Sequence, residues 1–266
     1  MPPLKSNIPT IITVHDLTHL HYYTGLHAAY YDFVLRPLFR RCHTIFCVSQ
    51  FTRTELLDWS GISPEKVLVV SNGVSPRFFT TSSEAGIPFP YVLYPGNRRP
   101  YKNIERLCRA YAGSVLPARG IHLLMTGEQD EYLSRLVQSA RIEGYVHATG
   151  VVSEQRLAEL YRSALLVALV SLYEGFGLPI LEAMASGVPV LTSNVSAMPE
   201  IAAGASLLIN PSEIAEIRDG LELLAFDEGL RASLIQKGIE RAAQFNWANS
   251  AKKVWNVVCE LDPALH

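Results

Sequence analysis

Short runs of apolar and β-branched residues recur along the whole chain, separated by longer stretches with helical periodicity. The runs lack the alternation of apolar and polar residues typical of a half-exposed strand, so they suit strands buried on both faces. Strands that alternate with helices form βαβ units around a parallel sheet, and the α/β fold class is therefore predicted. Nine strands are expected: Thr10–Val14, Thr44–Ser49, Val67–Ser71, Tyr91–Tyr94, Ile121–Thr126, Tyr145–Thr149, Leu165–Val170, Pro189–Thr192 and Ser206–Ile209.

A break in composition falls at Ser75–Pro90, which is rich in Pro, Ser and Thr and has no apolar period. We interpret it as a linker. It separates residues 1–88, with three predicted strands, from residues 89–245, with six, enough for a complete domain. Three parallel strands make a poor core with a bare edge. The N-terminal part is therefore expected to be incomplete, either because the chain is truncated, which we favour, or because a partner subunit completes it.

The closing segment, residues 246–266, contains a predicted amphipathic helix over Trp247–Leu261. Helical periodicity brings its apolar side chains onto one face, which is expected to pack back on the N-terminal part. The residues of that predicted face are Trp247, Ala251, Val254, Trp255 and Val258.

Charge and cysteine content exclude several classes of protein. The 266 residues include 23 Lys+Arg and 25 Asp+Glu, and general nucleic-acid binding needs a basic excess that is missing here. None of the four cysteines lies in a CxxC pair, so we expect no structural metal and interpret them as buried thiols. No apolar stretch is long enough to cross a bilayer and the first residues lack a signal peptide. We expect a cytoplasmic protein.

The segment Ser171–Gly187, SLYEGFGLPILEAMASG, carries the strongest functional pattern. Gly175 and Gly177 remove side chains where a strand meets a helix that starts near Pro179. Free N–H groups and the positive end of the helix dipole can bind phosphate or sugar oxygens there, in the crevice where parallel sheets bind ligands. Glu174 precedes the glycines, and Glu182 lies two helical turns further on, able to reach ribose hydroxyls. The alternative is a glycine turn with Glu182 paired inside the fold.

A second candidate site is YPGNRRPYKN, residues 94–103, which follows a predicted strand. Gly96 allows close approach of the backbone, and Arg98, Arg99 and Lys102 bring three cations to the strand end. Arginine offers a planar fork and lysine a point charge, and both suit a bound phosphate. The alternative is a solvated basic loop.

A third candidate site is TVHDLTHLH, residues 13–21, at the end of the first predicted strand. His15 and Asp16 come directly after that strand, and Asp16 can orient an imidazole. His19 and His21 add two further imidazoles. Three histidines at this spacing, with no nearby cysteine and no HExxH motif, are a weak metal signal, and no metal site is expected.

The run E-G-F-G-L-P-x-x-E-A-M-A-x-G-x-P-V and the following Pro189–Gly204 resemble family-4 retaining glycosyltransferases, which have the two-domain GT-B fold. The resemblance extends over the chain from Thr10 onward. It implies that residues 89–245 form a complete Rossmann-like domain binding a nucleotide-diphosphate sugar, and that residues 1–88 are part of the acceptor-side Rossmann-like domain. It also implies that Glu174 contacts the donor sugar and Glu182 the ribose. The backbone amides of four residues would then face the sugar and diphosphate: Gly175, Phe176, Gly177 and Leu178.

The resemblance assigns His15 to the donor sugar or reaction centre, and Lys102 to the diphosphate. The family often has an arginine where Asn97 stands, so Arg98 is expected to substitute, and the choice between Arg98 and Arg99 stays open. Val48–Thr52 resembles the family's V-S-x-x-T turn. Members need no bound metal, and no cofactor is expected beyond the donor.

We therefore expect a retaining hexosyltransferase. It would transfer a mannose-like hexose to a saccharide or lipid-linked acceptor. The alternative is a truncated nucleotide-sugar-binding module, non-catalytic or needing a partner subunit. An epimerase of the same architecture fits less well, since no flanking acid–base carboxylates are found. Residues Gly25–Arg41 combine apolar and basic side chains. They are interpreted mainly as core packing, with contact to the acceptor or to the inner face of a membrane as the other reading.

Overall fold

The structure, a computed structural model, describes residues 8–80 and 85–261. Within these residues all nine predicted strands are present, each within two residues of its expected limits, so the α/β fold class is confirmed. The strands are β1 (Ile11–Val14), β2 (Thr44–Cys47), β3 (Val67–Val69), β4 (Tyr91–Tyr94), β5 (His122–Met125), β6 (Val146–Ala148), β7 (Leu166–Leu169), β8 (Val190–Ser193) and β9 (Leu207–Ile209).

The strands form two sheets, one with the order β1-β2-β3 and one with the order β6-β5-β4-β7-β8-β9. Every pair of neighbouring strands is parallel. In the six-stranded sheet the strand order reverses between β4 and β7. Ligands of open α/β sheets bind outside the carboxyl ends of the strands at such a reversal. The chain leaves β4 into the loop of residues 94–103 and leaves β7 into the motif of residues 171–187, so the topology brings both segments to that position.

The chain divides into two compact units that do not follow simple sequence order. Unit 1 comprises Met1–Gly73, Tyr173–Phe176 and Phe245–His266, and unit 2 comprises Val74–Leu172 and Gly177–Gln244. Four residues from the middle of the motif therefore belong to the unit that is built mainly from the beginning and the end of the chain.

In unit 1, residues Gly25–Arg41, a segment that we read from the sequence as a helix, do not form one continuous α-helix. A π-helical turn, η1 (Tyr31–Leu35), separates two α-helical pieces. Pro37 stands at the start of the second piece, and its missing N–H prevents a regular α-helical bond across the junction. The helices of unit 1 are α1 (Thr18–Tyr22), α2 (Leu26–Tyr30), α3 (Arg36–Arg41), α4 (Gln50–Ser60) and α12 (Trp247–Leu261), with a short turn η2 (Pro64–Lys66).

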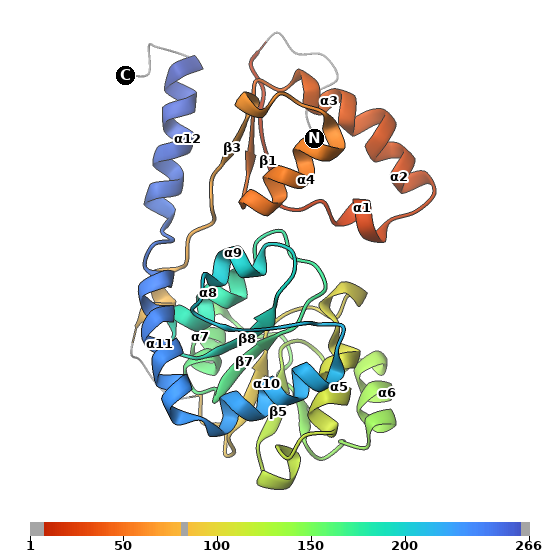
Figure 1. Cartoon of the computed structure of the whole chain (residues 1–266), viewed down its shortest axis with the longest axis vertical. Helices are drawn as coiled ribbons and strands as arrows, with labels where there is room; N and C mark the ends of the chain where they lie inside the picture. The colour runs from red at the N-terminus through yellow and green to blue at the C-terminus, as the bar shows by residue number, and fades with distance from the viewer. Residues whose placement is uncertain (1–7, 81–84, 262–266) are drawn as a thin grey trace. The chain divides into compact units, whose positions relative to one another are not determined.

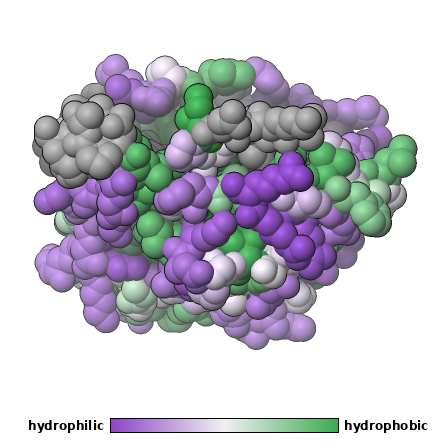
Figure 2. Space-filling view, turned by 90° about the horizontal axis from the view of Figure 1, so that it is seen from above, coloured by the Kyte–Doolittle hydropathy of each residue, from purple (hydrophilic) through white to green (hydrophobic). Residues whose placement is uncertain are grey.

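The core of unit 1 lies between the three-stranded sheet and the helices α3 and α4. Leu35, Leu38 and Phe39 are buried there, as core packing of the 25–41 segment predicts. Leu26 and Phe33 are instead 89% and 81% exposed, so only one side of this segment is core. Figure 2 shows hydrophobic side chains exposed in separate groups between hydrophilic ones.

Helix α12 has the predicted limits but not the predicted face. Trp247 and Trp255 are both more than half exposed, whereas Ser250, Val257 and Cys259 are buried. The hydroxyl of Ser250 donates a hydrogen bond to the Ser71 carbonyl at 2.5 Å. The helix thus meets a polar backbone segment, which favours a small side chain over tryptophan, and the expected apolar face is wrong for this reason.

In unit 2, the inner strands β4, β7 and β8 of the six-stranded sheet are buried at every residue. Strands buried on both faces read as uninterrupted apolar runs. Among the helices of this unit, α5 contacts α6 and α10, α8 contacts α7, α9 and α11, and α10 contacts α11 (Figure 1). They are α5 (Ile104–Ala112), α6 (Glu131–Ala140), α7 (Glu154–Arg162), α8 (Leu178–Ala185), α9 (Met198–Ala202), α10 (Ile214–Phe226) and α11 (Glu228–Ala242), with short turns η3 (Pro76–Phe79), η4 (Pro100–Lys102) and η5 (Pro117–Arg119).

The predicted linker Ser75–Pro90 contains the turn η3, and residues 81–84 lie outside the described part. Phe78 is buried and its ring meets that of Tyr161 edge-on, with centroids 5.6 Å apart. Among the described residues, no helix is long and apolar enough to cross a membrane.

Candidate functional site

The motif Ser171–Gly187 begins just beyond β7 and enters α8, whose first turn contains Pro179 as predicted. Gly177 caps the N-terminus of the helix in the left-handed backbone conformation, with φ 95°. Residues other than glycine rarely adopt this conformation. Because Tyr173–Phe176 belongs to unit 1 and Gly177 begins the next part of unit 2, the two predicted glutamates lie in different units. Each is described in its own surroundings.

Tyr173 fixes the start of the four-residue segment within unit 1. Its side chain is buried, and its hydroxyl donates to Glu55 Oε2 at 2.6 Å and accepts from the Leu17 amide at 3.0 Å. The other oxygen of Glu55 lies 2.6 Å from His21 Nε2. Burial, together with the hydrogen bond to Glu55, raises the pKa of Tyr173, so this hydroxyl stays protonated and able to donate.

Gly175 fixes the other side of Glu174. Its carbonyl accepts hydrogen bonds from Ser49 Oγ at 2.7 Å and from Thr52 Oγ1 at 2.9 Å. A Cβ added to Gly175 would overlap the His15 carbonyl oxygen and crowd Asp16. The glycine is therefore required for close approach to the loop that follows β1.

Two more predicted residues complete this part of unit 1. Phe176 is buried and its ring lies edge-on to Phe245, with centroids 5.9 Å apart. His15 is exposed at the end of β1, and Glu174 is half-buried between the two anchored residues. The loops that carry His15 and Glu174, the two predicted catalytic residues, thus touch each other through Gly175 within one unit.

Glu182 lies on α8 in unit 2 and is half-buried. Tyr161, on the neighbouring helix α7, donates a hydrogen bond to Glu182 Oε2 at 2.8 Å. Burial raises the pKa of the Glu182 carboxyl, and the Tyr161 hydrogen bond opposes that rise. Among the described residues, the hydrogen-bond partner of this half-buried carboxylate is therefore a tyrosine hydroxyl.

The loop after β4 is held by short polar contacts. The Gly96 amide donates to Thr126 Oγ1 at 2.8 Å, and the Tyr94 hydroxyl donates to the carbonyl of Asn97 at 2.6 Å. Lys102 ends the short turn η4, with its ammonium 5.5 Å from the centre of the Tyr101 ring.

The two arginines of this loop have different surroundings. The Arg98 side chain is only 9% exposed, and its guanidinium donates to the carbonyls of Glu128 and Thr126 at 2.6 and 3.2 Å and to Asp130 Oδ2 at 3.0 Å. Arg99 is exposed. Arg98 thus links its own loop to the loop after β5, whereas the Arg99 side chain reaches solvent.

Several residues that position the site were not singled out from the sequence. Asn103 is buried, and its Nδ2 donates to the carbonyls of Val170 and Pro211 at 2.9 and 2.7 Å, joining the loops after β4, β7 and β9. Nothing in the sequence indicated that Tyr161, Glu55 and Tyr173 position the site. For Ser49 and Thr52, the resemblance of Val48–Thr52 to the V-S-x-x-T turn was the sequence signal of their role.

The histidine cluster of residues 13–21 splits into separate environments. His15 is exposed, His19 is buried and stacked on Tyr31 with centroids 3.5 Å apart, and His21 pairs with Glu55. Among the described residues, no three His, Cys, Asp or Glu side chains are grouped so that they could hold a metal ion.

Two parallel sheets, with a glycine-capped helix at the strand-order reversal of the larger one, define an α/β protein of the GT-B type. Known structures support this fold. Sucrose-phosphate synthase from Thermosynechococcus elongatus matches with a TM-score of 0.84 at 24% identity, over 96% of this chain and 68% of that one. Anabaena HepE in complex with UDP and glucose matches with a TM-score of 0.83 at 20% identity, over 95% of this chain and 72% of that one.

The chain belongs to the glycosyl transferases group 1 family, because the model of that family matches residues 82–241. Residues 2–78 match Glycosyltransferase Family 4. O-antigen chain mannosyltransferase B of Escherichia coli is 29% identical over 92% of this chain and 69% of its own length. The serotype-specific mannosyltransferase WbdA of Escherichia coli is 32% identical over 92% of this chain. The chain spans only 33% of WbdA.

Proposed function

We propose that this chain carries the donor-binding and catalytic residues of a retaining hexosyltransferase. It would move a mannose-like hexose from a nucleotide-diphosphate sugar to a saccharide or lipid-linked acceptor. Family membership supports transfer of a sugar, and the names of the two Escherichia coli relatives support mannose. The observation that carries the proposal is the anchoring of the motif segment on both sides of Glu174, at Tyr173 and at Gly175.

In this proposal unit 2 is the donor-binding domain and unit 1 the acceptor side. The amides of Gly177 and Leu178, at the N-terminus of α8, would face the diphosphate, where the helix dipole favours negative charge. Glu182 would accept from the ribose hydroxyls through Oε1, since Tyr161 occupies Oε2. Gly96 and Asn97 would line the same crevice, and Lys102 would meet the phosphate charge.

The proposed reaction breaks the bond between the anomeric carbon and the phosphate oxygen, and its electron pair leaves with the diphosphate. The acceptor hydroxyl forms the new bond on the same face, and its proton passes to the departing phosphate. The carboxylate of Glu174 would stabilise the positive charge that develops on the sugar. His15 would contact the donor sugar as a hydrogen-bond partner at the reaction centre.

The test measures binding and transfer separately. Thermal unfolding with GDP-, UDP- and ADP-sugars should show a raised Tm with one nucleotide, because a ligand that binds the folded state stabilises it. Glu174→Ala should keep that rise and lose turnover by about 100-fold or more. Glu131→Ala, an exposed glutamate on α6, is the matched control. A folded protein whose Tm no nucleotide sugar moves would contradict the donor site.

Substitutions of the two arginines of the 94–103 loop should affect different quantities in the same thermal-unfolding assay. Arg99→Ala is expected to weaken the Tm rise from the nucleotide sugar while leaving unfolding without ligand unchanged, because Arg99 is exposed. Arg98→Ala should lower the Tm of the free protein, because it removes three hydrogen bonds within unit 2. Equal effects of the two substitutions on unliganded stability would contradict this division.

A second candidate function is a nucleotide-sugar-binding module that needs a partner to transfer. The chain spans only 33% of the length of WbdA. Transfer could therefore need parts that a partner supplies, which supports this second function. It predicts the same Tm rise with no turnover by the wild-type chain. Turnover by the purified chain alone would exclude it.

We also propose that unit 1 makes peripheral contact with a membrane surface. The exposed side chains of Leu26 and Phe33 support this. Sedimentation with anionic vesicles should fall for Leu26→Ser/Phe33→Ser relative to wild type, and equal sedimentation would contradict it.

A further inference from the structure

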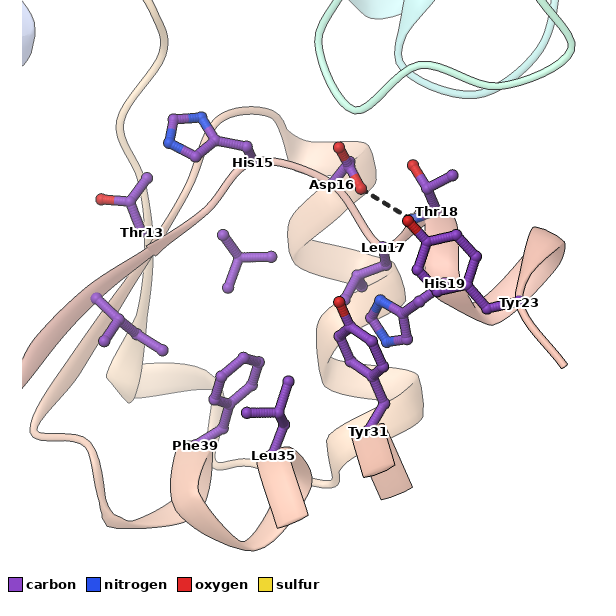
Figure 3. Close-up of a pocket in the computed structure, with 12 residues that line it drawn as sticks. Thr13, His15, Asp16, Leu17, Thr18, His19, Tyr23, Tyr31, Leu35 and Phe39 are labelled. Atoms are coloured by element: carbon purple, nitrogen blue, oxygen red, sulfur yellow. Dashed lines mark hydrogen bonds between the residues drawn. The ribbon is translucent and has the colours of Figure 1, made fainter. Parts of the chain in front are cut away.

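A pocket of about 290 Å³ lies in unit 1 at the carboxyl end of β1. Its walls come from residues 12–19 and from the segment that contains α2, η1 and α3 (Figure 3). This volume is at the lower end of the ~300–1,000 Å³ found for small-molecule sites, so it suits one small ring. None of the donor-binding residues in unit 2 lines it.

His19 is the feature of this pocket that calls for a ligand. Its side chain is 6% exposed, and its buried Nε2 has no hydrogen-bond partner among the described residues. The ring is held on two sides, by stacking on Tyr31 and by an edge contact with Trp59 at 5.2 Å between centroids. Buried polar atoms are nearly always hydrogen-bonded, so a rigidly held imidazole nitrogen without a partner points to a group that binds there.

The charges of the side chains that line the pocket indicate whether its ligand is charged or neutral. Burial lowers the pKa of His19 to about 4, so its imidazole is neutral near pH 7 and can accept from or donate to a hydroxyl. Asp16, also in the lining, uses Oδ1 to accept from the Thr18 amide at 3.0 Å. A neutral imidazole next to an acidic side chain favours an uncharged hydroxyl over a phosphate group.

The remaining walls combine two surfaces that suit different parts of a sugar. Leu35 and Phe39 form an apolar wall, and Tyr23 and Tyr31 carry phenol hydroxyls on the other side (Figure 3). A pyranose has an apolar C–H face and hydroxyls at its rim, and it would meet both.

We propose that this pocket binds one uncharged pyranose ring, which donates or accepts a hydrogen bond at His19 Nε2 and packs its C–H face against Leu35 and Phe39. The inference rests on the proposed function only in taking that ring as part of the acceptor. It makes His19, in helix α1, a residue that selects the acceptor.

The experiment titrates methyl α-D-mannopyranoside into the protein labelled with ¹⁵N-histidine and follows the imidazole nitrogens by long-range ¹H–¹⁵N correlation. The His19 Nε2 resonance should shift saturably. His19→Phe keeps the stacking ring and should weaken binding about fivefold, the loss expected from one neutral hydrogen bond. His43→Gln is the control, because His43 is exposed and outside the pocket.

The outcomes separate this proposal from the proposed function. If the Tm rises with a nucleotide sugar but the glycoside leaves the wild-type His19 Nε2 unshifted, the pocket proposal is overturned and the donor site stands. If the glycoside shifts His19 and no nucleotide sugar raises the Tm, the pocket stands and the donor site fails. A glycoside shift that is equal in wild type and His19→Phe for the remaining histidines would also overturn the pocket proposal. The wild-type titration decides the matter even if His19→Phe does not fold.

Discussion

The two glutamates of the motif are only eight positions apart, yet different kinds of contact hold them. Glu174 sits on an irregular segment whose neighbours are tied to unit 1 by Tyr173 and the Gly175 carbonyl. Glu182 sits on the regular helix α8 of unit 2 and is held through its own carboxylate by Tyr161. A helix supplies its own backbone hydrogen bonds, so only the side chain needs orienting. A loop has no such support, and its backbone must be fixed by side chains from elsewhere.

The largest effect is expected from Gly175→Ala, which tests the loop side of the comparison. The new Cβ would overlap the backbone of His15, and backbone cannot rotate away as a flexible side chain can. We expect a loss of about 3 kcal/mol in the free energy of unfolding, at the upper end for over-packing. Displacing Glu174 should also reduce turnover by about 100-fold. Chemical denaturation and a transfer assay measure the two effects.

Gly144→Ala is the matched control for that substitution. A Cβ at Gly144 meets nothing within 4 Å and its φ is not positive, so stability and turnover should stay within error of wild type. If Gly175→Ala behaves like Gly144→Ala, the close approach of the two loops does not position Glu174.

The second largest effect is expected from a change next to Glu182 on helix α8, and the loss of stability should depend on pH. Tyr161→Phe removes the hydrogen bond that stabilises ionised Glu182, so the raised pKa of Glu182 should rise further. A folded-state carboxyl with a raised pKa binds its proton more tightly than in the unfolded chain, so stability falls as pH rises through that window. The destabilisation should therefore be about 1.5–3 kcal/mol near pH 7 and smaller near pH 4.

Tyr91→Phe provides the comparison for this pH dependence. Its hydroxyl donates to the neutral carbonyl of Leu160 at 2.7 Å, so its removal should cost the same at both pH values. Denaturation midpoints of the two variants at each pH decide the question. Parallel losses in Tyr161→Phe and Tyr91→Phe would mean that Glu182 does not depend on Tyr161 for its charge.

The smallest effect is expected from Thr52→Val, which removes one of two hydroxyls from the Gly175 carbonyl while keeping the side-chain shape. Because Ser49 still donates to that oxygen, the loss should be about 0.5–1.5 kcal/mol. Thr54→Val is the control on the same helix, where the exposed hydroxyl donates to the Gln50 carbonyl. A Thr52→Val stability no different from that of Thr54→Val would remove Thr52 from the anchoring of the loop.

The strands of this chain were predictable because each is a short run of consecutive apolar and β-branched residues. Four of them, β2, β4, β7 and β8, are buried at every residue. The motif glycines and Pro179 likewise predicted the start of α8. The apolar face of α12 was not predictable by the same means. Periodicity identifies which side chains share a face but not whether the surface opposite is apolar, and here it is the Ser71 backbone.

The contacts that hold the candidate site were also beyond reach of the sequence. Ser49 and Gly175 are 126 positions apart, and nothing in a serine indicates which distant carbonyl it will meet. Arg98 and Arg99 are adjacent and chemically identical. They differ because Arg98 donates to the carbonyls of Glu128 and Thr126 and to the Asp130 carboxylate. Local patterns predict elements and candidate residues, whereas tertiary hydrogen bonds decide which of them are held.

The assignment of Tyr173–Phe176 to unit 1 has a consequence for recombination between relatives. A chimera that takes residues 74–244 from another member as one block would replace Tyr173 and Gly175 while leaving their partners Glu55, Ser49 and Thr52 behind. An exchange of sugar specificity between relatives should therefore succeed more often when these four residues travel with the beginning of the chain, although they are encoded in the middle of the gene.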